Sequence, residues 1–290
     1  MSCQHRSVFS FLSASPSAQK TGALDLGLGR SAAIWRNAHD RMTYERTQDH
    51  TFSLYLEGGA GTRRLDAGSA HGWPGAVCLM PQGASSEWEI TDVFEFVHLY
   101  VPDHELRRVF TETFDQDARL MVLPEATFEH APALAEAMRC LAMATRSQQP
   151  LLAEEAINAA FVNVFRDPRY SGARSGAIRG GLSPAVRRRI LDYIEANLDT
   201  HVTLPELASI AGLSEFHLQR MFTASCGVSP HGWVLHRRLA RARTLLSGCD
   251  PIAQIASACG FSSQSHMTRV FKAMTGTTPS AYRHSISGAA

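Results

Sequence analysis

The chain has 290 residues, of which 44% are hydrophobic, and a formal net charge of +1 at pH 7. This hydrophobic fraction excludes a chain that is disordered throughout, and the length favours two domains over one. From residue 184 onward there are eleven Lys and Arg against six Asp and Glu, which leaves seventeen against twenty-one before that point. We therefore expect a basic C-terminal domain attached to a mildly acidic N-terminal one.

Residues 1–20 hold one short apolar run that serine interrupts, and we expect a disordered tail there rather than a signal peptide. No segment approaches the roughly 18 consecutive apolar residues that span a bilayer, so no membrane partner is expected. The six cysteines include no Cys-x-x-Cys pair. They are typical of reduced structural residues in a cytoplasmic protein, and a redox-sensing pair is the alternative.

Three segments of the N-terminal part alternate or run apolar between glycine turns: 52–56, 75–80 and 94–101. Short strands separated by such turns predict a small antiparallel β-barrel. Residues 103–113 are amphipathic, and two longer helices are expected at about 131–145 and 151–165. Their apolar faces would cover the barrel or meet a second subunit.

Part of this region resembles a cupin. Gly75, Pro81, Gly83 and Ser86 follow the spacing of the second cupin motif, although Ser86 stands where that motif has a metal-binding histidine. The first motif is missing, since His50 has Gln48 rather than a histidine two residues before it. A metal site needs three or more convergent ligands. We therefore predict a cupin-like fold with no metal, no cofactor, no catalytic residues and no enzyme activity.

Residues 171–181 are rich in glycine and serine, which is typical of a flexible linker. The expected boundaries follow: a tail at 1–20, a cupin-like domain at 21–170, a linker at 171–181 and a second domain at 182–290. Because few contacts should cross such a linker, we expect the last of these to fold and act unaided.

The C-terminal domain carries one pattern twice. Ala208 and Gly212 recur 48 residues later as Ala256 and Gly260, and Arg220 recurs 49 residues later as Arg269. Further landmarks share the offset of 49: Phe222 with Phe271, Gly227 with Gly276, and Pro230 with Pro279. A repeated offset indicates a repeated unit with one residue inserted at its turn.

Each copy has the features of a helix-turn-helix. A glycine ends the first helix at low steric cost, and Ser214, or Ser262 or Ser263, caps the second. The outward positions of the second helix carry amides and arginines, which form paired hydrogen bonds with purine edges in the DNA major groove. A plain packing motif is the alternative for a single copy. Two copies joined by a basic amphipathic helix at 230–247 favour DNA binding.

Residues 184–284 resemble the DNA-binding domain of the AraC/XylS family of bacterial transcription regulators. The similarity covers both copies, the connecting helix with Arg238 and Leu239, and the closing run from Gly260 to Arg283. It implies an α+β chain: a cupin-like antiparallel barrel with following helices, then an all-α domain of two helix-turn-helix subdomains joined by a long helix. The two recognition helices would lie about one DNA turn, roughly 34 Å, apart and enter two successive major grooves.

The resemblance assigns DNA contacts residue by residue. Base reading is expected from Glu215, Phe216, Gln219 and Arg220 in the first copy and from Gln264, Ser265 and Arg269 in the second. Phosphate contacts are expected from Ser214, Arg237, Arg238, Lys272 and Arg283.

The family layout also implies a sensor, in which a small molecule enters the barrel. The candidate pocket residues are Tyr55, Arg63, Trp73, Trp88, Phe96, His98 and Tyr100, with Arg64 as a further cation for an anionic effector. The predicted function is sequence-specific transcription regulation, as an activator that meets RNA polymerase, by a homodimer that binds double-stranded DNA. The alternative is an effector-independent regulator whose barrel only dimerises.

Overall fold

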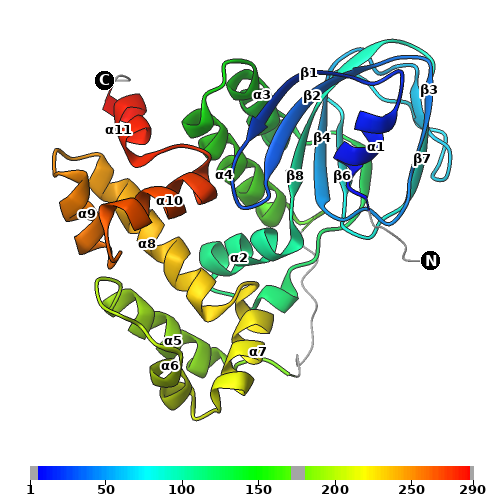
Figure 1. The fold of residues 1–290 in the computed structure, drawn as a ribbon. Helices are drawn as coiled ribbons and strands as arrows, with labels where there is room; N and C mark the ends of the chain where they lie inside the picture. The colour runs from blue at the N-terminus through cyan, green and yellow to red at the C-terminus, as the bar shows by residue number, and fades with distance from the viewer. Residues whose placement is uncertain (1–5, 171–179, 288–290) are drawn as a thin grey trace. The chain divides into compact units, whose positions relative to one another are not determined.

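The computed structural model describes residues 6–170 and 180–287. The chain divides into two compact units (Figure 1). One comprises residues up to 103 together with 122–170, and the other comprises 104–121 together with the residues from 180 onward. Of the expected linker at 171–181, residues 171–179 lie outside the described residues.

The first unit is built on two antiparallel sheets. The larger sheet has the strand order β1-β2-β8-β4-β6-β9, and the smaller has the order β3-β7-β5. The strands are β1 Gln19–Asp25, β2 Ser31–Asn37, β3 Asp40–Tyr44, β4 His50–Glu57, β5 Thr62–Arg64, β6 Val77–Met80, β7 Ser86–Ile90, β8 Phe94–Val101 and β9 Ala126–Glu129. The predicted strand segments fall on β4, β6 and β8, which confirms the antiparallel β architecture. In place of one closed sheet, the two sheets enclose a common aromatic core, and together they are called the barrel below.

Successive side chains of β8 point to opposite faces of the larger sheet, and each face borders a different core. Phe94, Phe96 and His98 face the space between the two sheets, together with aromatic residues of β2 and β4. The opposite face of the larger sheet carries helix α3, Pro132–Arg146, which packs against α4, Pro150–Arg166 (Figure 1). Both helices lie within a residue or so of their predicted ranges.

The N-terminal segment is not a tail. Helix α1, Val8–Ala14, begins at Ser7, whose hydroxyl accepts a hydrogen bond from the backbone amide of Ser10. Val8 and Leu12 are fully buried in the aromatic core between the sheets. Burial of these apolar side chains stabilises a helix too short to persist alone. The expected disorder over 1–20 is therefore wrong for residues 7–20.

The second unit is helical. Its elements are α2 Asp103–Phe114, the 3₁₀ turn η1 Ala118–Leu120, α5 Pro184–Ala196, α6 Leu204–Ala211, α7 Glu215–Cys226, α8 Pro230–Leu246, α9 Ile252–Ala258, α10 Gln264–Thr275 and α11 Pro279–Ser287. The core around Leu218 and Trp233 belongs to the first helix-turn-helix, and the core around Leu246 and Met267 belongs to the second. Helix α8 contributes to both, as the long connecting helix was predicted to do.

The segment 104–121 departs from the predicted boundaries. It lies in sequence between β8 and β9 of the first unit, yet it packs with the helical unit. The amphipathic pattern at 103–113 predicted helix α2 but not its partner. The expectation that 182–290 forms a complete domain is therefore corrected, because its compact unit also includes 104–121.

Candidate nucleic-acid interface

The two helix-turn-helix units end their first helices in the same way. Gly212 has φ of +65° and Gly260 has φ of +72°, the left-handed conformation that glycine adopts without steric strain. The chain then reverses within three residues to enter α7 or α10. The repeated glycines in the sequence therefore correspond to two equivalent sharp turns.

Serine hydroxyls begin both second helices. Ser214 accepts a hydrogen bond from the backbone amide of His217 at 3.4 Å and lies 3.2 Å from that residue's Nδ1. In the second copy Ser263 accepts from the amide of His266 at 3.1 Å, while Ser262 lies 2.9 Å from its Nδ1. In the first copy Ser214 contacts both the backbone amide and the ring of the histidine. In the second copy, which has one more residue, Ser263 caps the amide and Ser262 contacts the ring.

Helix α7 presents an exposed face opposite its buried stripe. Leu218 and Phe222 have no exposed surface, whereas Phe216 is 75% exposed. The other predicted reading residues, Glu215, Gln219 and Arg220, are exposed as well. The Phe216 ring contacts the His217 ring edge to face, with 6.2 Å between their centroids, and otherwise lies beside these polar groups.

Helix α10 repeats this arrangement. Met267 and Phe271 are fully buried. Gln264, Ser265 and Arg269 are exposed on the other side. Each copy therefore offers an amide and a guanidinium on one exposed helical face, which are groups that hydrogen bond to purine edges.

The predicted phosphate contacts fall into two groups. Ser214 and Lys272 are exposed at the ends of α7 and α10. The other three donate within the protein: Arg237 to the carboxylate of Glu195, Arg238 to the carbonyl oxygens of Leu198 and Thr200, and Arg283 to those of Leu246 and Asp250. Arg238 and Arg283 thus close the loops that precede the two helix-turn-helix units.

Sequence reasoning missed the role of His217 and His266. Their rings occupy equivalent positions beside the capping serines, and their spacing of 49 residues follows the repeat. That spacing was the signal that could have identified them. Both rings lie in the first turn of a recognition helix, beside the predicted reading residues.

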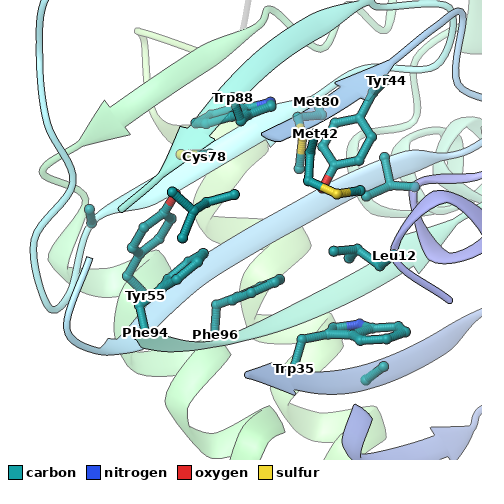
Figure 2. Packing of buried hydrophobic residues seen from close by; sticks show 14 of the residues in the cluster. Leu12, Trp35, Met42, Tyr44, Tyr55, Cys78, Met80, Trp88, Phe94 and Phe96 are labelled. Carbon is teal, nitrogen blue, oxygen red and sulfur yellow. The ribbon is translucent and has the colours of Figure 1, made fainter. Parts of the chain in front are cut away.

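The first unit has a small cavity between its two sheets, and Figure 2 shows several of the side chains packed around it, among them Tyr55, Trp88 and Phe96. Four predicted pocket residues line it: Tyr55, Trp88, Phe96 and His98. The lining also contains Leu12, Asn37, Tyr44, Ser53, Thr62, Cys78, Met80, Ile90 and Phe94. Its volume is about 30 Å³, enough for about one or two water molecules. The aromatic side chains fill the rest of the space.

The other three predicted pocket residues lie elsewhere. Tyr100 is buried, and its hydroxyl accepts a hydrogen bond from Trp35 Nε1 at 3.0 Å. Trp73 is 37% exposed. Arg63 forms an exposed ion pair with Glu89 at 2.6 Å. Arg64, the further candidate, is held by Asp66 and Glu125 at 2.9 and 2.6 Å.

The polar groups of the cavity are uncharged. Burial lowers the pKa of His98 to about 3, so its ring is neutral near pH 7. Its Nδ1 lies 3.0 Å from the Tyr100 hydroxyl. The Tyr100 hydroxyl accepts from Trp35, because an indole N–H only donates. No described lining residue carries a charge.

Within residues 6–170 and 180–287, no helix is both long enough and apolar enough to cross a membrane.

A family model described as a helix-turn-helix domain matches residues 207–285. The chain is 36% identical over 93 residues to the probable transcriptional regulator LumQ of Photobacterium leiognathi, covering 32% of this chain and 38% of LumQ. The chain thus spans well under half the length of that relative. It is 37% identical over 95 residues to the multiple antibiotic resistance protein MarA of Escherichia coli strain K12, covering 32% of this chain and 75% of MarA.

Among solved structures, an AraC-type transcriptional regulator from Chromobacterium violaceum is 32% identical, with a TM-score of 0.33. The match covers 34% of this chain and 90% of that one. The doubled helix-turn-helix, its equivalent caps and turns, and the identity over three quarters of MarA lead to one conclusion. The chain belongs to the AraC/XylS family of transcription regulators.

Proposed function

We propose that this protein regulates transcription by sequence-specific binding to double-stranded DNA through α7 and α10. The observation that carries the proposal is the exposed face repeated on these two helices, each capped and terminated in the same way. Two such helices joined by one long helix suit two successive major grooves. Phe216 would contact thymine methyl groups, and Gln219 and Arg220 would donate to purines, with Glu215 at the edge.

The second reading patch consists of Gln264, Ser265 and Arg269. Phosphate contacts are proposed from Ser214 and Lys272, whose polar groups are exposed. The bonds made by Arg237, Arg238 and Arg283 favour a structural role for these residues, because a phosphate would have to replace existing acceptors. Fewer phosphate contacts mean that fewer counterions are released when DNA binds.

Selection from randomised duplexes tests the proposal. The full chain is expected to enrich two short patterns whose centres lie about 10 base pairs apart. Recovery of no sequence preference, with affinity that depends on salt alone, would reduce the helical unit to a non-specific DNA binder. Activation through RNA polymerase and a cytoplasmic location are part of the same proposal.

The barrel is proposed to respond to a small uncharged molecule. Its cavity offers aromatic surface, the hydroxyls of Ser53 and Thr62 and the neutral imidazole of His98, and no described lining residue has a charge to pair with an anion. A ligand larger than water requires displacement of lining side chains, of which Leu12 comes from the separate helix α1. Thermal shift with neutral aromatic metabolites tests this proposal, since a ligand of the folded state raises stability.

The small volume of the cavity favours a second candidate, a regulator whose barrel only dimerises. In either case we propose a homodimer joined through α3 and α4, where Met143 is 64% exposed and Leu152 is 46% exposed. Sedimentation of the full chain at tens of micromolar tests the dimer. A strict monomer would exclude the dimer. A dimer that persists in the Met143→Glu chain would exclude this interface.

A further inference from the structure

The segment comprising α2 and η1 contacts the first helix-turn-helix on the side away from its reading face. A Cβ placed on Gly227, which ends α7, would lie 2.9 Å from both the Cβ of Arg107 and the backbone nitrogen of Arg108. The backbones of α2 and the end of α7 are therefore in direct contact, at a distance that only glycine permits. Phe216, Gln219 and Arg220 remain exposed.

Buried charges anchor the first half of α2 to α8. Glu105 is 1% exposed and pairs with Arg108 at 3.0 Å and with Nε2 of His236 at 3.3 Å. Burial alone would raise the pKa of Glu105, but the hydrogen bond from His236 and the charge of Arg108 bring it to about 2. Glu105 is therefore a carboxylate near neutral pH, and a buried carboxylate holds its partners in place, because separation would leave it uncompensated.

A second set of ion pairs anchors the end of α2 to α5. Asp115 accepts from Arg187 at 3.1 Å and from Arg188 at 2.6 Å. The Arg187 side chain is 6% exposed. Asp115 thus meets guanidinium groups on α5, and Glu112 lies 3.9 Å from that of Arg237 on α8, which gives the docking surface its charge complementarity.

The same segment is continuous with the barrel at both ends. It follows β8, whose residues Phe96 and His98 line the cavity, and it leads into β9. Asp103, the first residue of α2, lies 3.1 Å from Nε2 of His50 on β4.

We propose that the α2–η1 segment is a positioning element for the first recognition helix: docked on α5, α7 and α8, it holds α7 in its DNA-reading orientation. This rests on the proposed reading of DNA by α7. It assigns no such element to α10, so the two half-sites differ in their dependence on the segment. Asp115 and Glu105 are its positioning residues.

The test uses the full chain and a selected duplex, together with duplexes altered in the half-site of α7 or in that of α10. Asp115→Asn and Glu105→Gln remove one carboxylate each, Asp115→Glu keeps it, and Glu87→Gln removes a carboxylate paired with Arg41 on β3 as the control. Discrimination at the α7 half-site is expected to fall about three- to tenfold in the first two variants. Discrimination at the α10 half-site, and both values for the Asp115→Glu and control chains, are expected to match the parent.

Equal losses at both half-sites would mean that the segment only stabilises the fold, and would overturn the proposal. So would full discrimination by Asp115→Asn together with Glu105→Gln. If Glu105→Gln fails to fold, Asp115→Asn decides alone, because Asp115 lies at the surface. A parent chain that discriminates at neither half-site would overturn the proposed DNA reading, and this inference with it.

Discussion

The hydroxyl of Ser263 accepts a hydrogen bond from the backbone amide of His266 at 3.1 Å, and so begins the second recognition helix. Ser262, one residue earlier, bonds instead to the histidine ring. The repeat offset changes from 48 to 49 at this turn. Insertion of a residue has therefore preserved the helix cap while separating it from the contact to the ring.

Ser263→Ala is expected to lower the stability of α10 by about 0.5–2 kcal/mol, since it removes the side-chain acceptor for a helix-terminal amide. Ser262→Ala serves as the matched control and should have the smaller effect, because it leaves the cap intact. Amide hydrogen exchange along α10 measures both. Equal protection in the Ser263→Ala and parent chains would show that another group caps the helix.

Gly227→Ala is expected to destabilise the helical unit more than Gly212→Ala. Both residues have positive φ, at +83° and +65°, which costs about 1–2 kcal/mol for a residue with a Cβ. A Cβ at Gly212 meets nothing within 4 Å, whereas one at Gly227 meets the backbone of α2. Urea unfolding followed by far-ultraviolet circular dichroism compares the two. Equal losses would mean that α2 moves aside without cost.

The helix-turn-helix units could be predicted because their determinants are local. Gly212, Gly260 and the capping serines act within a few residues of their own positions, and the repeat offset ties the two copies together. The partners of the arginines could not be predicted. The sequence shows that Arg238 is charged, but its bond to the carbonyl of Leu198 depends on how two distant helices pack.

The same reasoning explains the errors in the N-terminal half. Residues 8–12 form too short an apolar run to predict a helix, and α1 is stable because a barrel assembled from distant strands buries Val8 and Leu12. The partner of Glu105 is His236, which lies in the other predicted domain. Binary patterning identified α2 as amphipathic, but it carries no information on which core receives the helix.

Acid is expected to destabilise the barrel through His98. Its pKa is about 3 in the folded chain, where it is buried, against about 6.5 when unfolded. Between these values the unfolded state binds more protons, so stability falls as pH falls, by about 2 kcal/mol between pH 7 and pH 5. His98→Gln should flatten this dependence, and the exposed His130→Gln should not. Urea unfolding followed by tryptophan fluorescence provides the measurement, and parallel pH profiles for all three chains would contradict the assignment.

Salt dependence of DNA binding separates phosphate contacts from internal bonds. Lys272→Gln is expected to reduce the magnitude of the slope of log K against log salt by about 0.9, because one released counterion is lost. Arg238→Gln should leave the slope unchanged, since its guanidinium already donates to Leu198 and Thr200. Fluorescence anisotropy with the full chain across a salt series measures both slopes, and a reversed pattern would restore Arg238 as a phosphate contact.

The division of base reading between α7 and α10 is tested most directly by randomised-duplex selection with the full chain and two variants, Arg220→Ala and Arg269→Ala. Arg41→Ala, which alters an exposed arginine on β3, serves as the control. Each reading variant is expected to weaken specific binding by about 1–3 kcal/mol and to relax base preference at a different half-site. If either variant keeps the full preference of the parent at every position, the helix that carries that arginine does not read DNA through it, and the two-helix account is wrong.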